Sequence, residues 1–141
     1  MTEPVAAPVA TVTAEPLDAD AVEASVLDDA HGALVAFRGI VRDHDTGRAV
    51  TGLDYQAHPE AERFLREACE RIAADTGLRV AAAHRVGSLA VGDVALVAAV
   101  GAAHRAEAFA ACARLVDDIK ATVPIWKRQH LVDGASEWVG L

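Results

Sequence analysis

The sequence predicts a single α+β domain, and three observations lead to this fold class. Strand-like runs of β-branched and small apolar residues alternate with two long segments of helical apolar periodicity. Short turns containing glycine separate neighbouring runs, which is typical of hairpin pairs. The length of 141 residues is that of one domain with a sizeable core. We therefore expect residues 1–8 to be a flexible N-terminus and residues 9–141 to form the domain.

The first half of the domain is predicted to hold three strands and two helices. The run VATVT (9–13) alternates β-branched and small residues, as strands do. Asp18 and Asp20 can cap a short helix over 21–27. Further along we expect a strand over 33–41, a turn at 45–47, a return strand over 50–57, and a helix from Pro59 to the Thr76-Gly77 stop.

The second half is predicted to hold four strands and one helix. Strands over 78–87 and 93–102 are expected to be joined by a loop that contains Gly87 and Gly92. A helix over 107–122 is expected to end because Val123 precedes a proline. Its expected buried face carries Phe109, Cys112, Val116 and Ile119, and a strand over 125–132, a turn at 133–134 and a short strand over 137–139 follow it.

The net charge of −8 is unevenly distributed along the chain. Residues 1–30 carry seven acidic residues and no basic ones, whereas the remainder carries 14 acidic and 13 basic residues. This nearly neutral body disfavours a nucleic-acid partner. We expect no secretion signal and no membrane span, and the presence of only two cysteines favours a reduced, cytoplasmic setting.

Lysine occurs at only two positions in the chain, Lys120 and Lys127, and arginine provides the other eleven basic side chains. An ammonium group can lose its proton when it is desolvated or placed near other cations, whereas a guanidinium group cannot. A site that needs a proton donor and acceptor, or an amine nucleophile, therefore selects lysine. We take both lysines as candidate catalytic residues, with a chance pairing as the alternative.

Two further groups of cations are candidates for binding an anion. His104 and Arg105 stand at the start of the helix over 107–122, where free backbone N–H groups attract anions. Arg38 and Arg42 lie at the end of a strand, and their alternative is ion pairing with nearby aspartates. Since Lys120 follows His104 by 16 residues, a continuous helix separates them by about 24 Å. If both serve one site, a second subunit must supply one of them.

The remaining reactive residue types are expected to be structural. The six histidines lack metal-ligand spacing, so we expect no metal site. Cys69 and Cys112 project from apolar helix faces and are expected to be buried. Trp126 and Trp138 are expected to anchor the core or an interface, and Asp117 is a candidate to orient Lys120.

Several segments, in their shared order, resemble the catalytic (large) subunit of molybdopterin synthase. The strongest match is DDIKATVPIWKR (117–128), in which a lysine is followed by a proline and then by Trp-Lys. The supporting segments are FRGIVR (37–42), LDYQAHP (53–59), HRVG (84–87) and AHR (103–105) with Phe109. The resemblance covers roughly residues 30–139, most of the chain.

The resemblance implies an α/β-hammerhead α+β fold and a homodimer. Each end of the dimer is expected to bind a small ubiquitin-like sulfur carrier, whose C-terminal Gly-Gly thiocarboxylate enters the active site. The implied reaction transfers two sulfurs to cyclic pyranopterin monophosphate and makes the dithiolene of molybdopterin, with no cofactor or metal in the enzyme. Lys120 and Lys127 match the family's catalytic lysines, and Arg42, His104 and Arg105 match its substrate-site residues, the last two contributed across the dimer.

This chain also departs from the family pattern. Gln129 stands where the family often has a glutamate, and Tyr55-Gln56 where it often has Tyr-Glu. Some members carry a further active-site arginine beyond the position where this sequence ends. That anion contact is expected to be either absent here or replaced by Arg38, Arg48 or Arg128. The alternative function is a non-catalytic dimer that binds an anionic ligand or a carrier tail.

Overall fold

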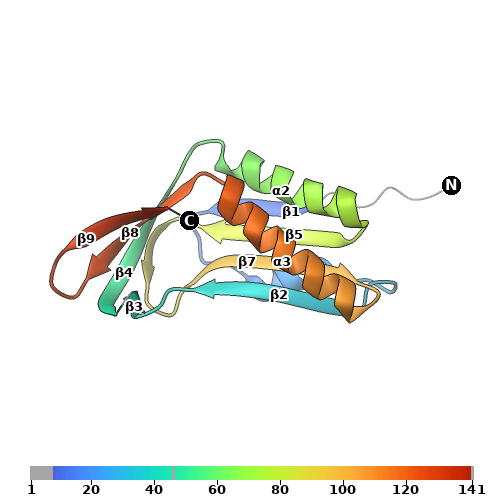
Figure 1. Ribbon diagram of the computed structural model, residues 1–141, viewed down its shortest axis with the longest axis horizontal. Helices are drawn as coiled ribbons and strands as arrows, with labels where there is room; N and C mark the ends of the chain where they lie inside the picture. The colour runs from blue at the N-terminus through green and yellow to red at the C-terminus, as the bar shows by residue number, and fades with distance from the viewer. Residues whose placement is uncertain (1–7, 46, 141) are drawn as a thin grey trace.

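The chain forms two β-sheets, and two long helices lie across one of them (Figure 1). The computed structural model describes residues 8–45 and 47–140, which contain three helices and nine strands. The strands are β1 (Val9–Thr13), β2 (Ala33–Ile40), β3 (His44–Asp45), β4 (Arg48–Ala57), β5 (Arg79–Arg85), β6 (Gly87–Ala90), β7 (Val94–Ala102), β8 (Ile125–Leu131) and β9 (Ser136–Gly140). The helices are α1 (Ala19–Ala24), α2 (Ala61–Thr76) and α3 (Arg105–Thr122). The predicted α+β class is confirmed, while the predicted flexible N-terminus lies outside the described residues except for Pro8.

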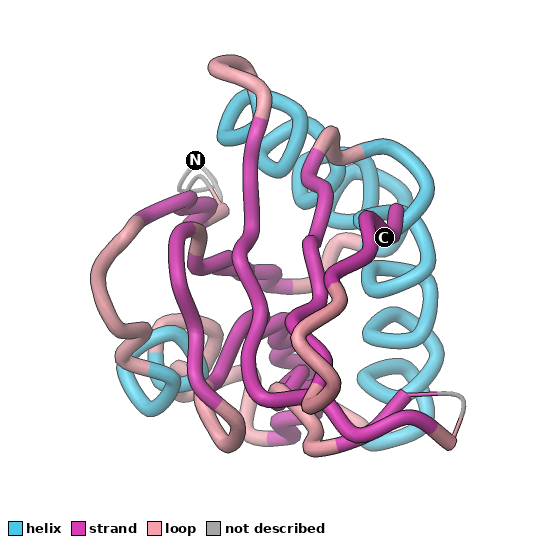
Figure 2. Tube along the Cα trace, turned by 90° about the vertical axis from the view of Figure 1, so that its left-hand side faces the viewer, coloured by secondary structure: helices cyan, strands magenta, loops and turns pink. Residues whose placement is uncertain are grey.

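The first sheet has helices on both faces. Its strand order is β1-β5-β7-β2, with β1 parallel to β5 and the other pairs antiparallel. Helix α2 packs on β1 and β5, and α3 packs on β7 and β2. The short α1 contacts the same strands from the opposite side, as Figure 2 shows. Because both faces are covered, β5 and β7 are buried along nearly their whole length.

The second sheet stands at one end of the first and forms one wall of the candidate site. It has the order β3-β4-β8-β9, and β6 pairs with β4 away from that path. The long strand β4 pairs antiparallel with β8 over most of its length. In Figure 1, the C-terminal ends of α3 and β2 both point towards this sheet.

Small residues let the helices approach the first sheet closely. Ala98 and Ala102 on β7 and Ala108 and Ala111 on α3 are all at most 2% exposed. The main core also contains the bulky Leu65, Leu115, Ile119 and Ile125, which fill the space between the helices and the strands. A close-packed interior leaves little free space for a helix to shift, so the position of α3 on the sheet is closely fixed.

The predicted helix ends agree well with the structure, and the starts agree less well. Gly77 ends α2 in the left-handed conformation with φ of 70°. Val123 is extended with φ of −83° and ψ of 121°, so α3 stops before Pro124 as expected. Helix α1 spans Ala19–Ala24 instead of 21–27, because the Asp18 carboxylate caps the helix by accepting a hydrogen bond from the backbone N–H of Ala21.

Two expectations about the interior and the loops are wrong, and a third is narrowed. Phe109 is 63% exposed, since the small Ala108 and Ala111 face the sheet in its place. Trp126 and Trp138 are 45% and 55% exposed, so neither anchors the core, and their expected role as interface anchors stays a prediction. The segment expected to be a loop after Gly87 contains strand β6, which pairs with β4 and not with its neighbours in sequence. The turn expected at 45–47 joins β3 to β4, and its central residue, Thr46, lies outside the described residues.

In the part of the chain that the structure describes, no helix has both the length and the apolar character needed to cross a bilayer.

Gly101 on β7 lies in close contact with the segment that follows α1. A Cβ atom placed on Gly101 would lie 1.9 Å from the backbone oxygen of Val26 and 2.8 Å from its carbonyl carbon. Val26 is 1% exposed and packs with Ala81 and Ala99 in a small cluster on the α1 side of the sheet. The segment after α1 can stay in place only if residue 101 lacks a side chain.

We predict that Gly101→Ala lowers the free energy of unfolding by about 2–4 kcal/mol. The added methyl group would overlap backbone atoms, and no side-chain movement can remove that overlap. Urea unfolding followed by circular dichroism measures this change. Gly32→Ala is the matched control, since nothing lies within 4 Å of a Cβ there. Equal stability of the two variants would contradict the close approach.

Candidate functional site

A pocket of about 440 Å³ lies where the two sheets meet the C-terminal end of α3. Both lysines of the chain reach it, Lys120 from α3 and Lys127 from β8. Tyr55 from β4 and His84 from β5 line it as well. The remaining lining residues come from β2, β7, α3 and the segment after β2: Phe37, Arg38, Gly39, Ile40, Arg42, Ala95, Leu96 and Ile119.

The chain reversal after α3 brings the two lysines together. Helix α3 carries Lys120 in its last turn and ends at Thr122. Pro124 cannot continue the helix, and β8 starts at Ile125 and runs along β4. Lys127 is therefore the third residue of a strand that leaves from the point where the helix stops. The two candidate catalytic lysines thus line one pocket.

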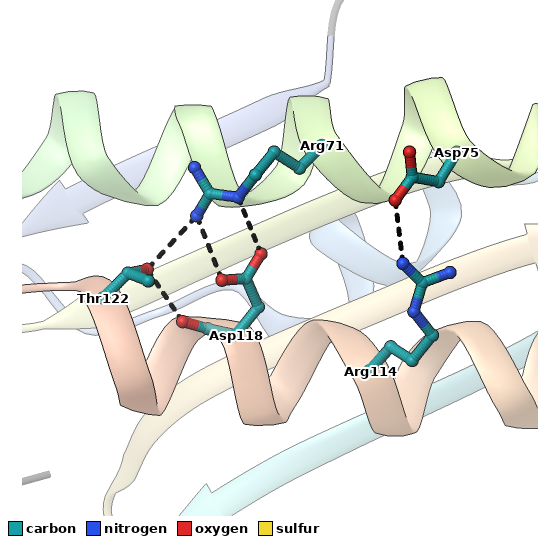
Figure 3. Close-up of polar contacts among 5 residues, drawn as sticks. All are labelled: Arg71, Asp75, Arg114, Asp118 and Thr122. Atoms are coloured by element: carbon teal, nitrogen blue, oxygen red, sulfur yellow. Dashed lines mark hydrogen bonds and ion pairs between the residues drawn. The ribbon is translucent and has the colours of Figure 1, made fainter.

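Two ion pairs join α2 to α3, as Figure 3 shows, and they favour one rotation of α3 about its axis. Arg71 on α2 donates two hydrogen bonds of 3.0 Å to the carboxylate of Asp118, one from Nε and one from Nη2. About one helical turn before Asp118, Arg114 on α3 donates a hydrogen bond to Asp75 on α2 at 2.8 Å. The bidentate pair between Arg71 and Asp118 directs Asp118 towards α2, and Lys120, two residues later, faces the pocket.

Asp117 is the candidate for orienting Lys120, with a solvated helix face as the alternative. Asp117 and Asp118 are adjacent on α3. Of these two carboxylates, in the described part of the chain only Asp118 forms a salt bridge, and its partner is Arg71. The expectation for Asp117 finds no support, because the hydrogen-bonded carboxylate faces the neighbouring helix.

The alternation of side chains along β8 decides which of its residues face the pocket. Lys127 pairs directly with Tyr55 on β4, so the two side chains share one face of the sheet. Arg128 lies on the other face, where it donates to Ser136 at 3.1 Å and sits 5.8 Å above the ring of Trp138. Arg128 was predicted to bind substrate, and within one chain it does not line the pocket.

Two arginines at the pocket differ in how strongly they are already engaged. Arg38 donates from Nε to Glu23 at 2.8 Å and from Nη2 to Asp20 at 2.9 Å, both on α1. These hydrogen bonds, with that to Glu23 the larger effect, raise the pKa of the Arg38 guanidinium. Arg42 has a single, longer ion pair with Asp45 at 3.6 Å and an exposed side chain. Arg42 is thus the more available of the two for an incoming anion.

The two lysines are the least engaged cations of the pocket. Among residues 8–45 and 47–140, no carboxylate lies within salt-bridge distance of Lys120 or Lys127. Three cationic groups, Lys120, Lys127 and Arg42, therefore converge on a pocket without a neutralising acid at the lysines. The positive potential of such a pocket attracts an anion that is small enough to fit inside it.

Tyr55 and His84 belong to the site but were absent from the predicted site residues. Tyr55 is 9% exposed and His84 is 2% exposed, and their rings meet edge to face with centroids 5.0 Å apart. Burial raises the pKa of Tyr55. A histidine inside the apolar run VAAAHRV (80–86), and the only tyrosine of the chain, are the sequence signals that could have pointed to them.

His104 and Arg105 lie at the far end of α3 from the pocket. His104 is the N-terminal capping residue of α3, with extended backbone and no side-chain capping bond, and both residues are exposed. Lys120 follows His104 by 16 positions along one unbroken helix, which separates the two residues by about 24 Å. Within one chain, the structure does not bring this pair to the lysine pocket.

The cysteines are buried, as predicted. Cys69 is 0% and Cys112 is 4% exposed. Burial raises the pKa of the Cys69 thiol to about 12 and also raises that of Cys112, so neither forms a thiolate readily. In the described ranges, no group of three or more histidine, cysteine, aspartate or glutamate side chains is arranged to hold a metal ion.

Comparison with known proteins identifies the family. The family model described as "MoaE protein" matches residues 12–122. A molybdopterin synthase catalytic subunit 1 from Mycobacterium tuberculosis is 45% identical over 137 residues, covering 94% of this chain and 91% of the relative. The molybdopterin synthase catalytic subunit from Nostoc sp. is 41% identical over 133 residues, covering 92% of this chain and 81% of the relative.

The fold agrees with the same family. The crystal structure of molybdopterin synthase from Staphylococcus aureus superposes with a TM-score of 0.85 at 32% identity, covering 92% of this chain and 96% of that chain. The resemblance inferred from the DDIKATVPIWKR segment is thereby confirmed. The chain belongs to the MoaE family, the family of the molybdopterin synthase catalytic subunits of molybdenum cofactor biosynthesis.

Proposed function

We propose that this chain is the sulfurtransferase subunit that converts cyclic pyranopterin monophosphate into molybdopterin. The sulfur arrives as the C-terminal Gly-Gly thiocarboxylate of a small ubiquitin-like carrier subunit. The observation that carries this proposal is the meeting of Lys120 and Lys127, the only lysines of the chain, in one pocket with Arg42. Family membership supports it, since the relatives are molybdopterin synthase catalytic subunits.

The chemistry of the reactants explains why such a pocket is needed. A cyclic phosphate and a thiocarboxylate are both anions, and cations placed between them lower their mutual repulsion. Each transfer forms a carbon–sulfur bond on the substrate and breaks a carbon–oxygen bond there, and a proton has to reach the departing oxygen. Water then cleaves the acyl C–S bond, which leaves the sulfur on the substrate and a carboxylate on the carrier. The amine of Lys120 or Lys127 is the group in this pocket that can both donate and accept a proton.

The state of the cysteines supports sulfur delivery by a partner. Both thiols are buried and both have raised pKa values, with that of Cys69 at about 12. A persulfide carried by this chain would need an accessible thiolate. Sulfur brought in on a carrier tail needs none.

The carrier and a second copy of the chain complete the proposed assembly. We propose a homodimer of α/β-hammerhead type in which His104 and Arg105 of one subunit complete the lysine pocket of the other, with one carrier bound at each end. Support comes from the length of α3, which keeps this pair about 24 Å from Lys120 in one chain. Leu34 and Phe37 on the edge strand β2, and Phe109 on α3, are also 37%, 37% and 63% exposed. Exposed apolar side chains of this kind favour burial against a partner.

Other predicted properties of the site are retained as proposals. Arg38 binds substrate only if the anion competes with Glu23 and Asp20. Arg128 binds substrate only if a neighbouring subunit reaches its face of β8. Arg48 forms ion pairs with Asp133 and Glu137, and an anion would have to compete with these carboxylates. The cytoplasmic setting and the absence of a cofactor remain predictions from the sequence.

Gln129 bears on where the protons of the reaction come from. It is 2% exposed, and its Nε2 donates two hydrogen bonds of 2.9 Å, one to Asp45 and one to Glu137. An amide can bridge two carboxylates in this way, whereas a carboxylate cannot. We infer that residue 129 takes no part in acid chemistry here, so proton transfer falls to the lysines.

We predict that Lys120→Arg and Lys127→Arg each lower molybdopterin formation at least 100-fold, because each keeps the positive charge but removes the titratable amine. The assay combines the purified chain with the thiocarboxylated carrier and cyclic pyranopterin monophosphate. Arg66→Lys on the exposed face of α2 is the matched control and should leave the rate unchanged.

The same assay separates the proposal from the non-catalytic alternative. Activity that survives both substitutions would reduce the lysines to a role of charge alone. Wild-type protein that binds the carrier but makes no product would establish the alternative, a dimer that only binds an anionic ligand or tail.

The shared site predicts complementation between two inactive variants. Lys120→Ala and the double variant His104→Ala/Arg105→Ala should each be inactive as homodimers. When the two are mixed under conditions that exchange subunits, half of the dimers pair one of each and contain one intact site. We therefore expect recovery of about a quarter of the wild-type activity. No recovery, with exchange verified by mass spectrometry, would place all catalytic groups in one chain.

We predict that Gln129→Glu lowers the free energy of unfolding by about 2 kcal/mol at pH 7.5, because a third carboxylate then faces Asp45 and Glu137. The pKa of the new glutamate is raised in the folded state. Its penalty is therefore present above that folded pKa and disappears as the pH falls through it towards about 5. Urea unfolding between pH 5 and 8 measures the effect.

Asp45→Asn added to the Gln129→Glu variant is the control for this prediction. It removes one of the two opposing charges and should restore part of the lost stability at pH 7.5. A penalty independent of pH and unchanged by Asp45→Asn would contradict the electrostatic explanation.

A further inference from the structure

His84 is a buried side chain of the lysine pocket that the proposed proton transfer does not use. It stands near the end of β5, is 2% exposed, and forms part of the pocket wall. Its ring is held edge to face against Tyr55, with centroids 5.0 Å apart and an interplanar angle of 74°. Both rings are thus fixed by the strands that carry them.

The hydrogen bond at one ring nitrogen determines what the other can do. Nδ1 lies 2.7 Å from the backbone oxygen of Arg85, and a carbonyl oxygen only accepts, so Nδ1 carries the hydrogen. Burial, assisted by the nearby charge of Lys120, lowers the pKa of His84 to about 4. The imidazole is therefore neutral at physiological pH, and Nε2 presents a lone pair.

Nε2 is open towards the pocket. Within the described ranges, it forms no hydrogen bond. In the same ranges, two side-chain polar atoms are fully enclosed and have no hydrogen-bond partner, namely Nε of Arg79 and Nε of Arg85. Nε2 of His84 is not one of these atoms, so it retains contact with the space that the ring lines.

The lone pair contrasts with the four charged groups of the pocket. Lys120, Lys127, Arg38 and Arg42 carry only hydrogen-bond donors when charged, and they suit a phosphate or a carboxylate. A neutral acceptor repels such anions and instead binds an N–H or O–H group. A cyclic phosphate diester has no such donor, whereas a pterin ring has several N–H groups.

We propose that Nε2 of His84 accepts a hydrogen bond from an N–H group of the pterin ring, so that the cations hold the phosphate while His84 sets the orientation of the heterocycle. This inference rests on the proposed function, because it names how the same pocket recognises the same substrate. It makes His84 a substrate-binding residue that discriminates a phosphorylated pterin from other phosphates. Tyr55 acts on it only by fixing the plane of the ring.

Nitrogen NMR of the complex with the carrier, with 15N in the histidine rings, observes the proposed bond directly. Without substrate, His84 should give one protonated and one unprotonated ring nitrogen. Addition of cyclic pyranopterin monophosphate should shift the unprotonated resonance upfield, as acceptance of a hydrogen bond does. The resonance is assigned by its loss in His84→Asn or, should that variant not fold, by elimination with variants of the five other histidines.

Binding measurements test the same bond by substitution. His84→Asn retains a short amide donor for the Arg85 carbonyl and removes the Nε2 acceptor. We expect it to weaken binding of cyclic pyranopterin monophosphate about tenfold, as the loss of one buried hydrogen bond does. Binding of inorganic phosphate and of the carrier should stay unchanged. His31→Asn, on a histidine before β2 and outside the pocket lining, is the control and should bind all three ligands as the wild type does.

The outcomes distinguish this inference from the proposed function. Wild-type protein that fails to bind the cyclic pterin overturns both. A wild type that binds it with an unshifted Nε2 resonance overturns the role of His84 alone, as does His84→Asn binding the pterin with wild-type affinity. An Nε2 resonance already shifted without substrate, and unchanged when substrate is added, would show that another donor keeps Nε2 occupied and would overturn the role in recognition.

Discussion

The packing of α3 on the first sheet is the constraint on which the site depends. Ala108 and Ala111 bring the helix close to β7, and the bidentate pair between Arg71 and Asp118 sets its rotation. Since the helix must stop before Pro124, its last turn ends beside the second sheet, and β8 begins there. The position of Lys120 follows from the helix, and that of Lys127 follows from the strand. A shift of α3 along the sheet would separate them.

The acidic N-terminal region acquires a structural role through Arg38. Asp20 and Glu23 on α1 bind its guanidinium, and α1 is held against the sheet by Val26 and by the absence of a side chain at Gly101. These carboxylates reduce the positive potential at one edge of the pocket, while Lys120, Lys127 and Arg42 leave it high at the other. An anion is therefore directed towards the lysines, which are the titratable cations.

The order of strands and helices, and most helix ends, could be predicted from the sequence, because periodicity, glycine and proline act locally. The pairing of β6 with β4 could not, since it is a contact between segments more than 30 residues apart that no local pattern encodes. The burial of Phe109 was predicted from spacing alone. The structure places alanines against the sheet instead, because a close helix leaves no room for a phenyl ring. Tertiary packing overrides amphipathic spacing at such contacts.

The site was predictable where residue choice is unusual and unpredictable where it is not. Lysine in an arginine-rich chain marked Lys120 and Lys127, and helix length alone separated His104 from Lys120 in one chain. Arg128 was expected in the pocket because it is cationic and adjacent to Lys127, but neighbours on a strand point to opposite faces. His84 was missed for the opposite reason: buried in an apolar strand, it has the sequence context of a core residue. Its function follows only from three-dimensional facts, namely a carbonyl that fixes the tautomer and cations that leave Nε2 as a neutral acceptor among donors. A pocket that recognises a phosphorylated heterocycle needs both kinds of group. In this fold β5 supplies the acceptor, while the cations come from α3, β8, β2 and the segment after β2.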